Sequence, residues 1–110
     1  MQRSKIETYL GFCIRAGKTV FGVDSLETQK KGVFLIVCDG GLSENSLKNA
    51  QKAQERFACP LLITEKDALG AWLHRPAVKA VGIRDKGLAA AILSVAENDP
   101  QFKLYSGGTN

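Results

Sequence analysis

The stretch VFLIVC, Val33–Cys38, is a continuous apolar run that lies between Gly32 and the pair Gly40-Gly41. An uninterrupted apolar run of this length, bounded by glycines, is typical of a β-strand that is covered on both faces. We therefore expect these residues to form a central strand of a sheet, with Phe34 and Ile36 in the hydrophobic core.

Helical and extended patterns alternate on both sides of this strand. The alternation predicts an α/β protein, a three-layer α/β/α sandwich with a small mixed four-stranded sheet between helices. The expected elements, in chain order, are a helix from Ser4 to Gly17, a strand over Thr19–Phe21 towards a sheet edge, a short helix capped by Asp24 or Ser25 that ends at Gly32, the central strand, a helix over Glu44–Phe57 capped by Ser43, a strand over Pro60–Thr64, a helix opened by a capping box at Thr64–Asp67 that runs through Leu73, a strand over Val78–Ile83, and a helix over Gly87–Glu97.

The length of 110 residues fits a single domain. We expect that domain over residues 1–98. Residues 99–110 contain a proline, a glycine pair and no periodicity, so they are expected to form a flexible tail. The side chains expected in the core are Ile14, Phe34, Ile36, Leu47, Leu62, Val81 and Ile92.

The composition, 45% hydrophobic and 24% charged, is that of a globular protein. There are 15 Lys and Arg against 11 Asp and Glu, a net charge of +4 that leans mildly towards a polyanionic partner. Cys13, Cys38 and Cys59 are odd in number and lie among apolar residues, which favours buried free thiols in a reducing cytoplasm over disulfides or a metal site. No stretch resembles a signal peptide or a membrane span, so we expect a cytoplasmic protein with no membrane partner.

The tripeptide Gly17-Lys18-Thr19 has the residues that end a nucleotide-binding P-loop. A P-loop needs four residues between its two glycines and lies between a strand and a helix. Here five residues separate Gly11 from Gly17, and the tripeptide follows an expected helix and precedes an expected strand. The sequence therefore predicts no nucleotide cofactor.

Other catalytic patterns are equally sparse. His74 is the only histidine and is expected in a solvated turn, since neither a metal cluster nor a two-histidine site can be built from it. Glu65 and Asp67 are explained by helix capping. The pair Lys30-Lys31 fits a solvated helix end, although it could also serve a phosphate backbone. We expect no enzymatic activity, no metal and no cofactor.

Several short strings resemble, in order and spacing, the kink-turn RNA-binding ribosomal proteins of the L-seven-Ae and L-thirty-e type. The nearest resemblance is to small bacterial proteins of that superfamily, which shares the Gadd-type fold. The strings cover nearly all of the chain between Ser4 and Glu97, and they are Leu10–Lys18, Val20–Gly22, Cys38-Asp39, Ser43–Asn45, Ala68–Gly70 and Ile83–Ala89.

The resemblance implies a sandwich that binds structured RNA without catalysis, in a bacterial ribonucleoprotein, with the ribosome as a further partner. It implies a first RNA contact over Gly22–Thr28, a second over His74–Val78, and a basic residue, Lys18, at the strand entrance. Where the family motif has Asn or Lys, then Glu or Gln, then Lys, this chain has Asp24, Ser25 and Thr28. The RNA-binding residues implied in this way are Lys18, Gly22, Val23, Asp24, Ser25, Thr28, Arg75, Pro76 and Val78.

Three classes of function fit these observations. The first is a non-catalytic RNA-binding protein associated with ribosomal or other non-coding RNA. The second is a protein-interaction module that has the same fold and has lost RNA binding. The third is an enzyme, or a detached substrate-recognition domain of an RNA methyltransferase. Salt separates the first two, because binding through phosphates weakens steeply with added salt and a hydrophobic interface does not.

We predict that Gly17-Lys18-Thr19 binds neither ATP nor GTP, because both the glycine spacing and the order of elements differ from those of a P-loop. Isothermal titration with Mg-ATP and Mg-GTP should show no heat of binding. Micromolar binding that disappears in Lys18→Ala would contradict this prediction.

Overall fold

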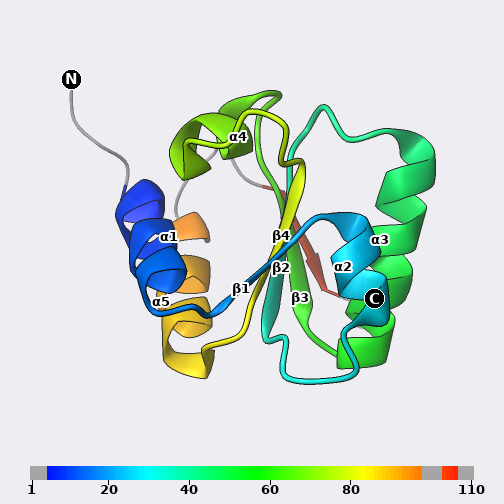
Figure 1. The fold of residues 1–110 in the computed structure, drawn as a ribbon, viewed down its shortest axis with the longest axis horizontal. Helices are drawn as coiled ribbons and strands as arrows, with labels where there is room; N and C mark the ends of the chain where they lie inside the picture. Colours follow the sequence, from blue (N-terminus) through cyan, green and yellow to red (C-terminus); the bar gives the residue numbers. More distant parts are fainter. Residues whose placement is uncertain (1–4, 98–102, 107–110) are drawn as a thin grey trace.

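The computed structural model describes residues 5–97 and 103–106, and it confirms the expected α/β fold (Figure 1). Helices and strands alternate along the chain, as the sequence patterns predict. The elements are α1 (Lys5–Arg15), β1 (Thr19–Phe21), α2 (Val23–Thr28), β2 (Leu35–Cys38), α3 (Glu44–Phe57), β3 (Pro60–Ile63), α4 (Ala68–Leu73), β4 (Ala80–Ile83), α5 (Lys86–Ala96) and β5 (Lys103–Ser106).

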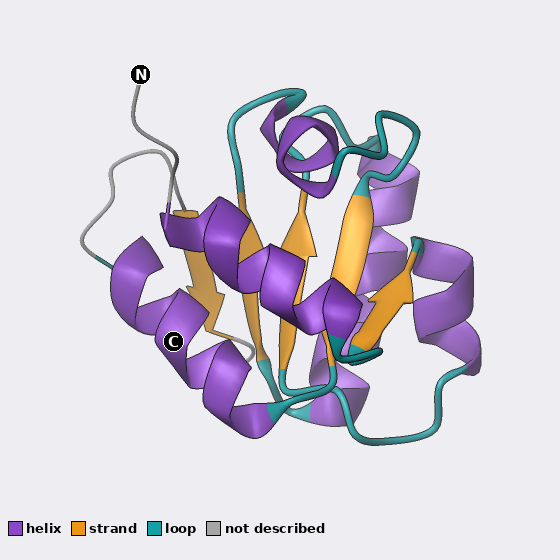
Figure 2. Ribbon diagram, turned by 60° about the vertical axis from the view of Figure 1, so that its left-hand side comes forward, coloured by secondary structure: helices purple, strands orange, loops and turns teal. Residues whose placement is uncertain are grey.

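The strands form one mixed sheet in the order β1-β4-β2-β3-β5. β2 and β3 are parallel, and the other neighbouring pairs are antiparallel. α1, α4 and α5 cover one face of the sheet, while α2 and α3 cover the other (Figures 1 and 2). Each face therefore has its own layer of core side chains.

β2 lies in the middle of the sheet, with β4 on one side and β3 on the other. All four of its residues are buried. Leu35 and Val37 pack under α1, α4 and α5, whereas Ile36 and Cys38 pack under α2 and α3. Because successive strand residues point to opposite faces, a strand between two helix layers must be apolar at every position. The continuous run in the sequence has this origin.

Phe34 departs from the expected core. The residue is 40% exposed. It precedes β2, and its backbone N–H donates to the carbonyl of Ile83 at 2.8 Å, at the last residue of β4. The aromatic ring therefore lies at the end of the sheet rather than between the helix layers. The other expected core residues are buried or packed against the core, and they are Ile14, Ile36, Leu47, Leu62, Val81 and Ile92.

The end of α1 accounts for Gly17-Lys18-Thr19. Gly17 has a φ of 68°, in the left-handed region. Its N–H donates to Ile14 O at 3.0 Å, and the N–H of Lys18 donates to Cys13 O at 2.9 Å. This pair of bonds is a Schellman motif, in which glycine is favoured because it lacks a Cβ. The tripeptide closes a helix and leads into β1.

The ends of α2 differ from the sequence expectation. The helix is preceded by Gly22, which has a φ of 88°, and no side chain caps it, so the predicted cap at Asp24 or Ser25 is wrong. β1 ends only one residue earlier, which leaves no room for a capping turn. At the other end the helix stops at Thr28, well before Gly32. There the guanidinium of Arg56 donates to Leu26 O at 2.6 Å and to Gln29 O at 3.1 Å, satisfying carbonyls that the helix leaves free.

Two longer helices begin with side-chain caps. Ser43 Oγ accepts a hydrogen bond from the N–H of Ser46 at 3.2 Å, as predicted for α3. Asp85 Oδ1 accepts one from the N–H of Leu88 at 2.8 Å, at the start of α5. Each cap satisfies a backbone donor that has no partner within its helix.

β5 is an element that the sequence patterns do not predict. Lys103–Ser106, which lie in the segment expected to be a flexible tail, pair antiparallel with β3 and add a fifth strand to the four expected ones. Residues 98–102 and 107–110 lie outside the described part of the chain. A four-residue edge strand depends on the open edge of β3 for its hydrogen bonds, so local pattern is a weak guide to it. No helix among the described residues could cross a membrane.

The three cysteines are buried free thiols, as expected. Burial, with a smaller contribution from Asp85, raises the pKa of Cys13 to about 11. Burial and the charge of Asp39 raise the pKa of Cys38 to about 12, and burial raises that of Cys59 to about 11. All three thiols are therefore protonated at neutral pH.

We predict that Gly82→Ala destabilises the fold. A Cβ at this position in β4 would lie 2.6 Å from Leu26 Cδ2 and 3.2 Å from Val33 Cγ1, so these two buried side chains would have to shift within a packed core layer. The expected loss is about 1–2 kcal/mol of unfolding free energy, measured by urea denaturation. The matched control is Gly11→Ala within α1, where the nearest atom is 3.6 Å away and alanine should add up to about 1 kcal/mol. Equal effects of the two changes would contradict the prediction.

Candidate functional site

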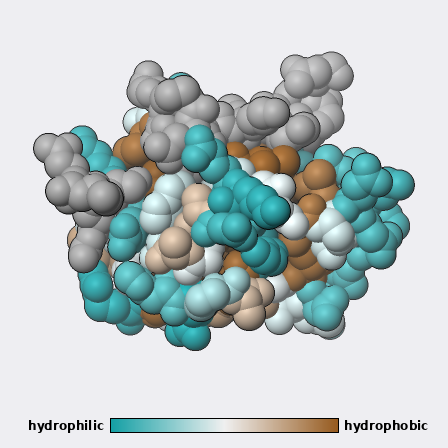
Figure 3. Space-filling model, turned by 90° about the horizontal axis from the view of Figure 1, so that it is seen from above, coloured by the Kyte–Doolittle hydropathy of each residue, from teal (hydrophilic) through white to brown (hydrophobic). Residues whose placement is uncertain are grey.

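An open groove of about 440 Å³ lies at the end of the sheet where β1 and β2 finish and β4 begins. α2, the start of α3 and the segment before β4 form its walls. Figure 3 shows this end of the molecule from above, where hydrophilic groups alternate with apolar patches. The groove is lined by Phe21, Gly22, Val23, Asp24, Ser25, Leu42, Ser46, Ala77, Val78, Lys79 and Ala80.

The groove brings together the two segments that the family resemblance singles out. Residues 22–25 come from the first segment, and residues 77–78 from the second, although about 50 residues separate them in the sequence. The antiparallel pairing of β1 with β4 produces this proximity, because it matches Phe21 with Val81. The turn into α2 and the turn into β4 therefore meet at one edge.

Arg75 and Pro76 lie beside the groove without lining it. The guanidinium of Arg75 is 4.8 Å from the centre of the Phe21 ring, and that ring forms part of the groove wall. Pro76 approaches α4, where a Cβ on Gly70 would lie 3.0 Å from its Cα. Arg75 therefore supplies a positive charge at the rim.

Thr28 and Lys18 do not line the groove. The hydroxyl of Thr28 donates to Ser25 O at 3.0 Å, at the far end of α2. Lys18 precedes β1, whereas Gly22 follows it, so their Cα atoms are separated by about 13 Å of extended chain. Lys18 and the groove therefore lie at opposite ends of β1.

The groove also contains residues that sequence reasoning did not select. Leu42 and Ser46 come from the loop after β2 and the first turn of α3. A usable signal was present, since ligands of α/β proteins commonly bind beyond the carboxyl ends of parallel strands, and β2 is parallel to β3. The other lining residues outside the two implied segments are Phe21, Lys79 and Ala80.

Charged side chains in the groove are few. Asp24 is exposed in the first turn of α2 and is in none of the ion pairs that the structure gives for residues 5–97. Lys79 is already paired, with its Nζ 3.2 Å from Asp67 Oδ1 and 3.9 Å from Asp39 Oδ2. Free positive charge at the site therefore comes chiefly from Arg75 at the rim.

The carboxylate of Asp39 fixes the loops around the groove. Its side chain is fully buried. Oδ2 accepts hydrogen bonds from the N–H of Gly41 at 2.7 Å and of Asp67 at 3.0 Å, and Oδ1 accepts one from Leu69 at 3.2 Å. Asp39 thus joins the end of β2 to the start of α4.

This arrangement replaces the capping box expected at Thr64–Asp67. Asp67 is the residue before α4, but its own side chain makes no capping hydrogen bond and its φ is 67°. The acceptor for the first turn of α4 comes instead from Asp39, 28 residues earlier in the chain. Asp67 directs its carboxylate to Lys79.

The surroundings of Asp39 favour its ionised form. Burial of the carboxyl group, taken alone, would raise its pKa. The three backbone N–H donors, together with the charge of Lys79, outweigh burial and hold the pKa of Asp39 below its ordinary value. The carboxylate is therefore charged at neutral pH and acts as an acceptor only.

His74 lies in an exposed turn, as expected. It ends α4 in a left-handed conformation, and its Nε2 lies 3.4 Å from Glu7 Oε2. It does not line the groove. Within the described part of the chain, no group of three or more His, Cys, Asp or Glu side chains is placed to hold a metal ion. The groove offers hydroxyls, backbone groups and apolar contacts, which suit binding.

Comparison with known proteins identifies the fold. No protein-family profile matches the sequence. No curated protein matches it either. A solved structure described as a protein with unknown function from Bacillus halodurans C is similar, with a TM-score of 0.70 and 16% sequence identity. The similarity covers 84% of this chain and 97% of that one. At this identity the likeness concerns the fold.

We predict that Asp39→Ala lowers the free energy of unfolding by about 3 kcal/mol, because it leaves several backbone donors without an acceptor. Asp85→Ala serves as a matched control, since Asp85 accepts a single hydrogen bond at the start of α5 and its loss should cost about 1 kcal/mol. Urea denaturation followed by circular dichroism measures both. Equal losses in the two variants would show that Asp39 is an ordinary helix cap.

The same carboxylate should make stability depend on pH. The pKa of Asp39 is lower in the folded protein than its ordinary value of 3.8. The contribution of the Asp39 carboxylate to the free energy of unfolding is therefore complete above about pH 4, and it is lost as the pH falls through the folded-state pKa. The stability difference between the wild type and Asp39→Asn should narrow below about pH 4. A difference that stays the same at pH 7 and pH 3 would contradict this.

Proposed function

We propose that this protein binds structured RNA without catalysis, and that the groove is the contact surface. The observation that carries the proposal is the meeting of residues 22–25 with residues 77–78 in one hollow. These are the two segments that the resemblance to kink-turn-binding ribosomal proteins implies. The expected partner is ribosomal or other non-coding RNA in the cytoplasm, with the ribosome as a further candidate.

The chemistry of the groove fits RNA whose helix is distorted. Proteins read RNA sequence mainly at loops and bulges, where bases are splayed out and their edges are accessible. Ser25 and Ser46 offer hydroxyls in the groove, and Leu42 and Val78 offer apolar contact for a base. The volume of about 440 Å³ lies in the range of pockets that hold small ligands. An extruded nucleotide can therefore enter.

Asp24 should weaken this binding. It lines the groove, is exposed, and carries a charge of the same sign as a phosphate. Replacement by Asn removes the repulsion and adds a hydrogen-bond donor. We expect Asp24→Asn to tighten RNA binding by about 1 kcal/mol, roughly fivefold.

The second candidate function is a protein-interaction module. It is favoured by the scarcity of free positive charge in the groove, where Lys79 is paired with Asp67 and Asp24 is negative. In that case the apolar lining would serve a protein partner. Binding of RNA would then be weak and indifferent to changes in the groove.

The test compares binding to a kink-turn RNA with binding to a straight duplex, over a series of salt concentrations. Ala77→Glu places a negative charge in the groove, and Ala71→Glu places the same charge at an exposed position of α4 outside it. We expect Ala77→Glu to weaken kink-turn binding about tenfold or more, Ala71→Glu to leave it nearly unchanged, and Arg75→Ala to reduce the salt dependence.

Two results would overturn the RNA proposal. One is equal binding of both RNAs by the wild type and all variants, and the other is no binding of either RNA. Either would leave the interaction module as the better explanation. A preference for the kink-turn RNA that Ala77→Glu removes would support the groove as the RNA site.

A further inference from the structure

A second distinctive surface lies at the opposite end of the sheet from the groove. Three segments meet there, before β1, before β2 and after β4. The N–H of Arg84 donates to Lys18 O at 2.8 Å, and the N–H of Phe34 donates to Ile83 O at 2.8 Å. Two backbone hydrogen bonds thus hold Lys18, Phe34 and Arg84 on neighbouring pieces of chain.

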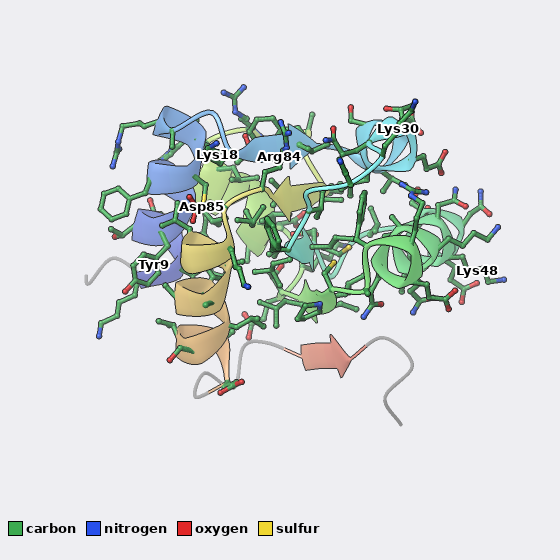
Figure 4. The ribbon with its side chains drawn as sticks, turned by 90° about the horizontal axis from the view of Figure 1, so that it is seen from below. Tyr9, Lys18, Lys30, Lys48, Arg84 and Asp85 are labelled. Carbon is green, nitrogen blue, oxygen red and sulfur yellow. The ribbon has the colours of Figure 1, made fainter. Side chains whose placement is uncertain are left out.

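The loops at this end are rich in positive charge. Lys18, Lys30, Lys31 and Arg84 are all exposed, and we call these four residues with Phe34 the basic end. In Figure 4, which looks at the molecule from below, Lys18 and Arg84 lie next to one another and Lys30 lies farther along, beside α2. None of the ion pairs given for residues 5–97 involves any of the four cations.

Acidic groups do little to neutralise these loops. Asp85 is the acidic residue within them, and its Oδ1 is engaged by the N–H of Leu88. The loops at the groove end, by comparison, carry acidic and basic residues in equal number. They contain Asp39, Glu65 and Asp67 against Lys66, Arg75 and Lys79. The free positive charge of the loops is therefore concentrated away from the groove.

Phe34 is the second observation at the basic end. The residue is 40% exposed in the same cluster of loops as these cations, and none of the ring contacts among the described residues involves it. Phe12 is similarly exposed, at 44%, but it lies near Arg15 and Tyr9 on the outer side of α1. An exposed aromatic ring among unpaired cations suits a nucleic-acid strand, because a base can stack on the ring while phosphates contact the cations.

We propose that the basic end binds a single-stranded segment of nucleic acid, with one base stacked on Phe34 and the phosphates held by Lys18, Lys30, Lys31 and Arg84. A single strand fits better than a duplex, since the base faces of a duplex are already stacked and cannot meet Phe34. This surface is separate from the groove, so it adds a second contact to the proposed function and does not depend on it.

The test uses a labelled strand of about twelve uridines and a duplex of the same length, followed by fluorescence anisotropy. Phe34→Ala should weaken binding of the single strand about fivefold or more, whereas Phe34→Trp should retain it. Phe12→Ala is the matched control, because it removes an equally exposed ring from another surface, and it should change little.

The charges are tested in the same assay. The double variant Lys18→Gln/Arg84→Gln should weaken binding and lower the slope of log affinity against log salt by about 1.4, which corresponds to two phosphate contacts. Lys48→Gln/Lys52→Gln removes two exposed charges from α3 and should leave the slope nearly unchanged. Melting temperatures show whether each variant is folded.

Three outcomes would overturn the proposal: wild-type affinity in Phe34→Ala, equal losses in Phe34→Ala and Phe12→Ala, or an unchanged salt slope in Lys18→Gln/Arg84→Gln. The groove is assessed separately through Ala77→Glu and the kink-turn RNA. If the protein binds uridine strands but does not recognise the kink-turn RNA, only the groove proposal is contradicted. If it recognises the kink-turn RNA but does not bind uridine strands, only the proposal for the basic end is contradicted.

Discussion

The hydrogen bonds of the buried Asp39 carboxylate hold together the loops on which the groove depends. They connect the end of β2 with the start of α4, and Lys79 extends the connection to the entrance of β4. Gly40 lets the loop after β2 pack closely against the loop after β3, because a Cβ at this position would lie 2.5 Å from Thr64 O. A charged group is tolerated in this position because three backbone donors replace the water it has lost. The walls of the groove are in this sense built around one ionised side chain.

The features that sequence predicted are those with local causes. The apolar run of β2 follows from helices on both sides of one strand, and Ser43 caps α3 with an acceptor only three residues from its donor. The features that it missed depend on distant parts of the chain. Asp39 caps a helix 28 residues away, β5 requires the free edge of β3, and the exposure of Phe34 depends on where β4 ends. The pattern of apolar and polar residues within a short stretch of sequence does not reveal contacts between such distant segments.

The candidate site also has one feature that was predicted and one that was not. The adjacency of residues 22–25 and 77–78 was anticipated through a family resemblance, and strand pairing explains it. The distance of Lys18 from the groove was not anticipated. A sequence motif does not show that the three residues of β1 separate Lys18 from Gly22 and place the two residues at opposite ends of the strand. The result is a molecule with a nearly neutral hollow at one end and a cationic surface with an exposed ring at the other. The two proposed RNA contacts therefore differ in charge and lie at opposite ends of the sheet.

The burial of the three thiols has a practical consequence. Cys13 lies in the core layer beneath α1, α4 and α5, while Cys38 and Cys59 lie in the layer beneath α2 and α3. A protonated, enclosed thiol reacts with an alkylating reagent only when its surroundings open. The chain therefore carries native reporters of its own fluctuations, one kind for each layer. Mass spectrometry after brief exposure to iodoacetamide can follow the two halves of the sandwich separately, with no engineered label and no change to either surface.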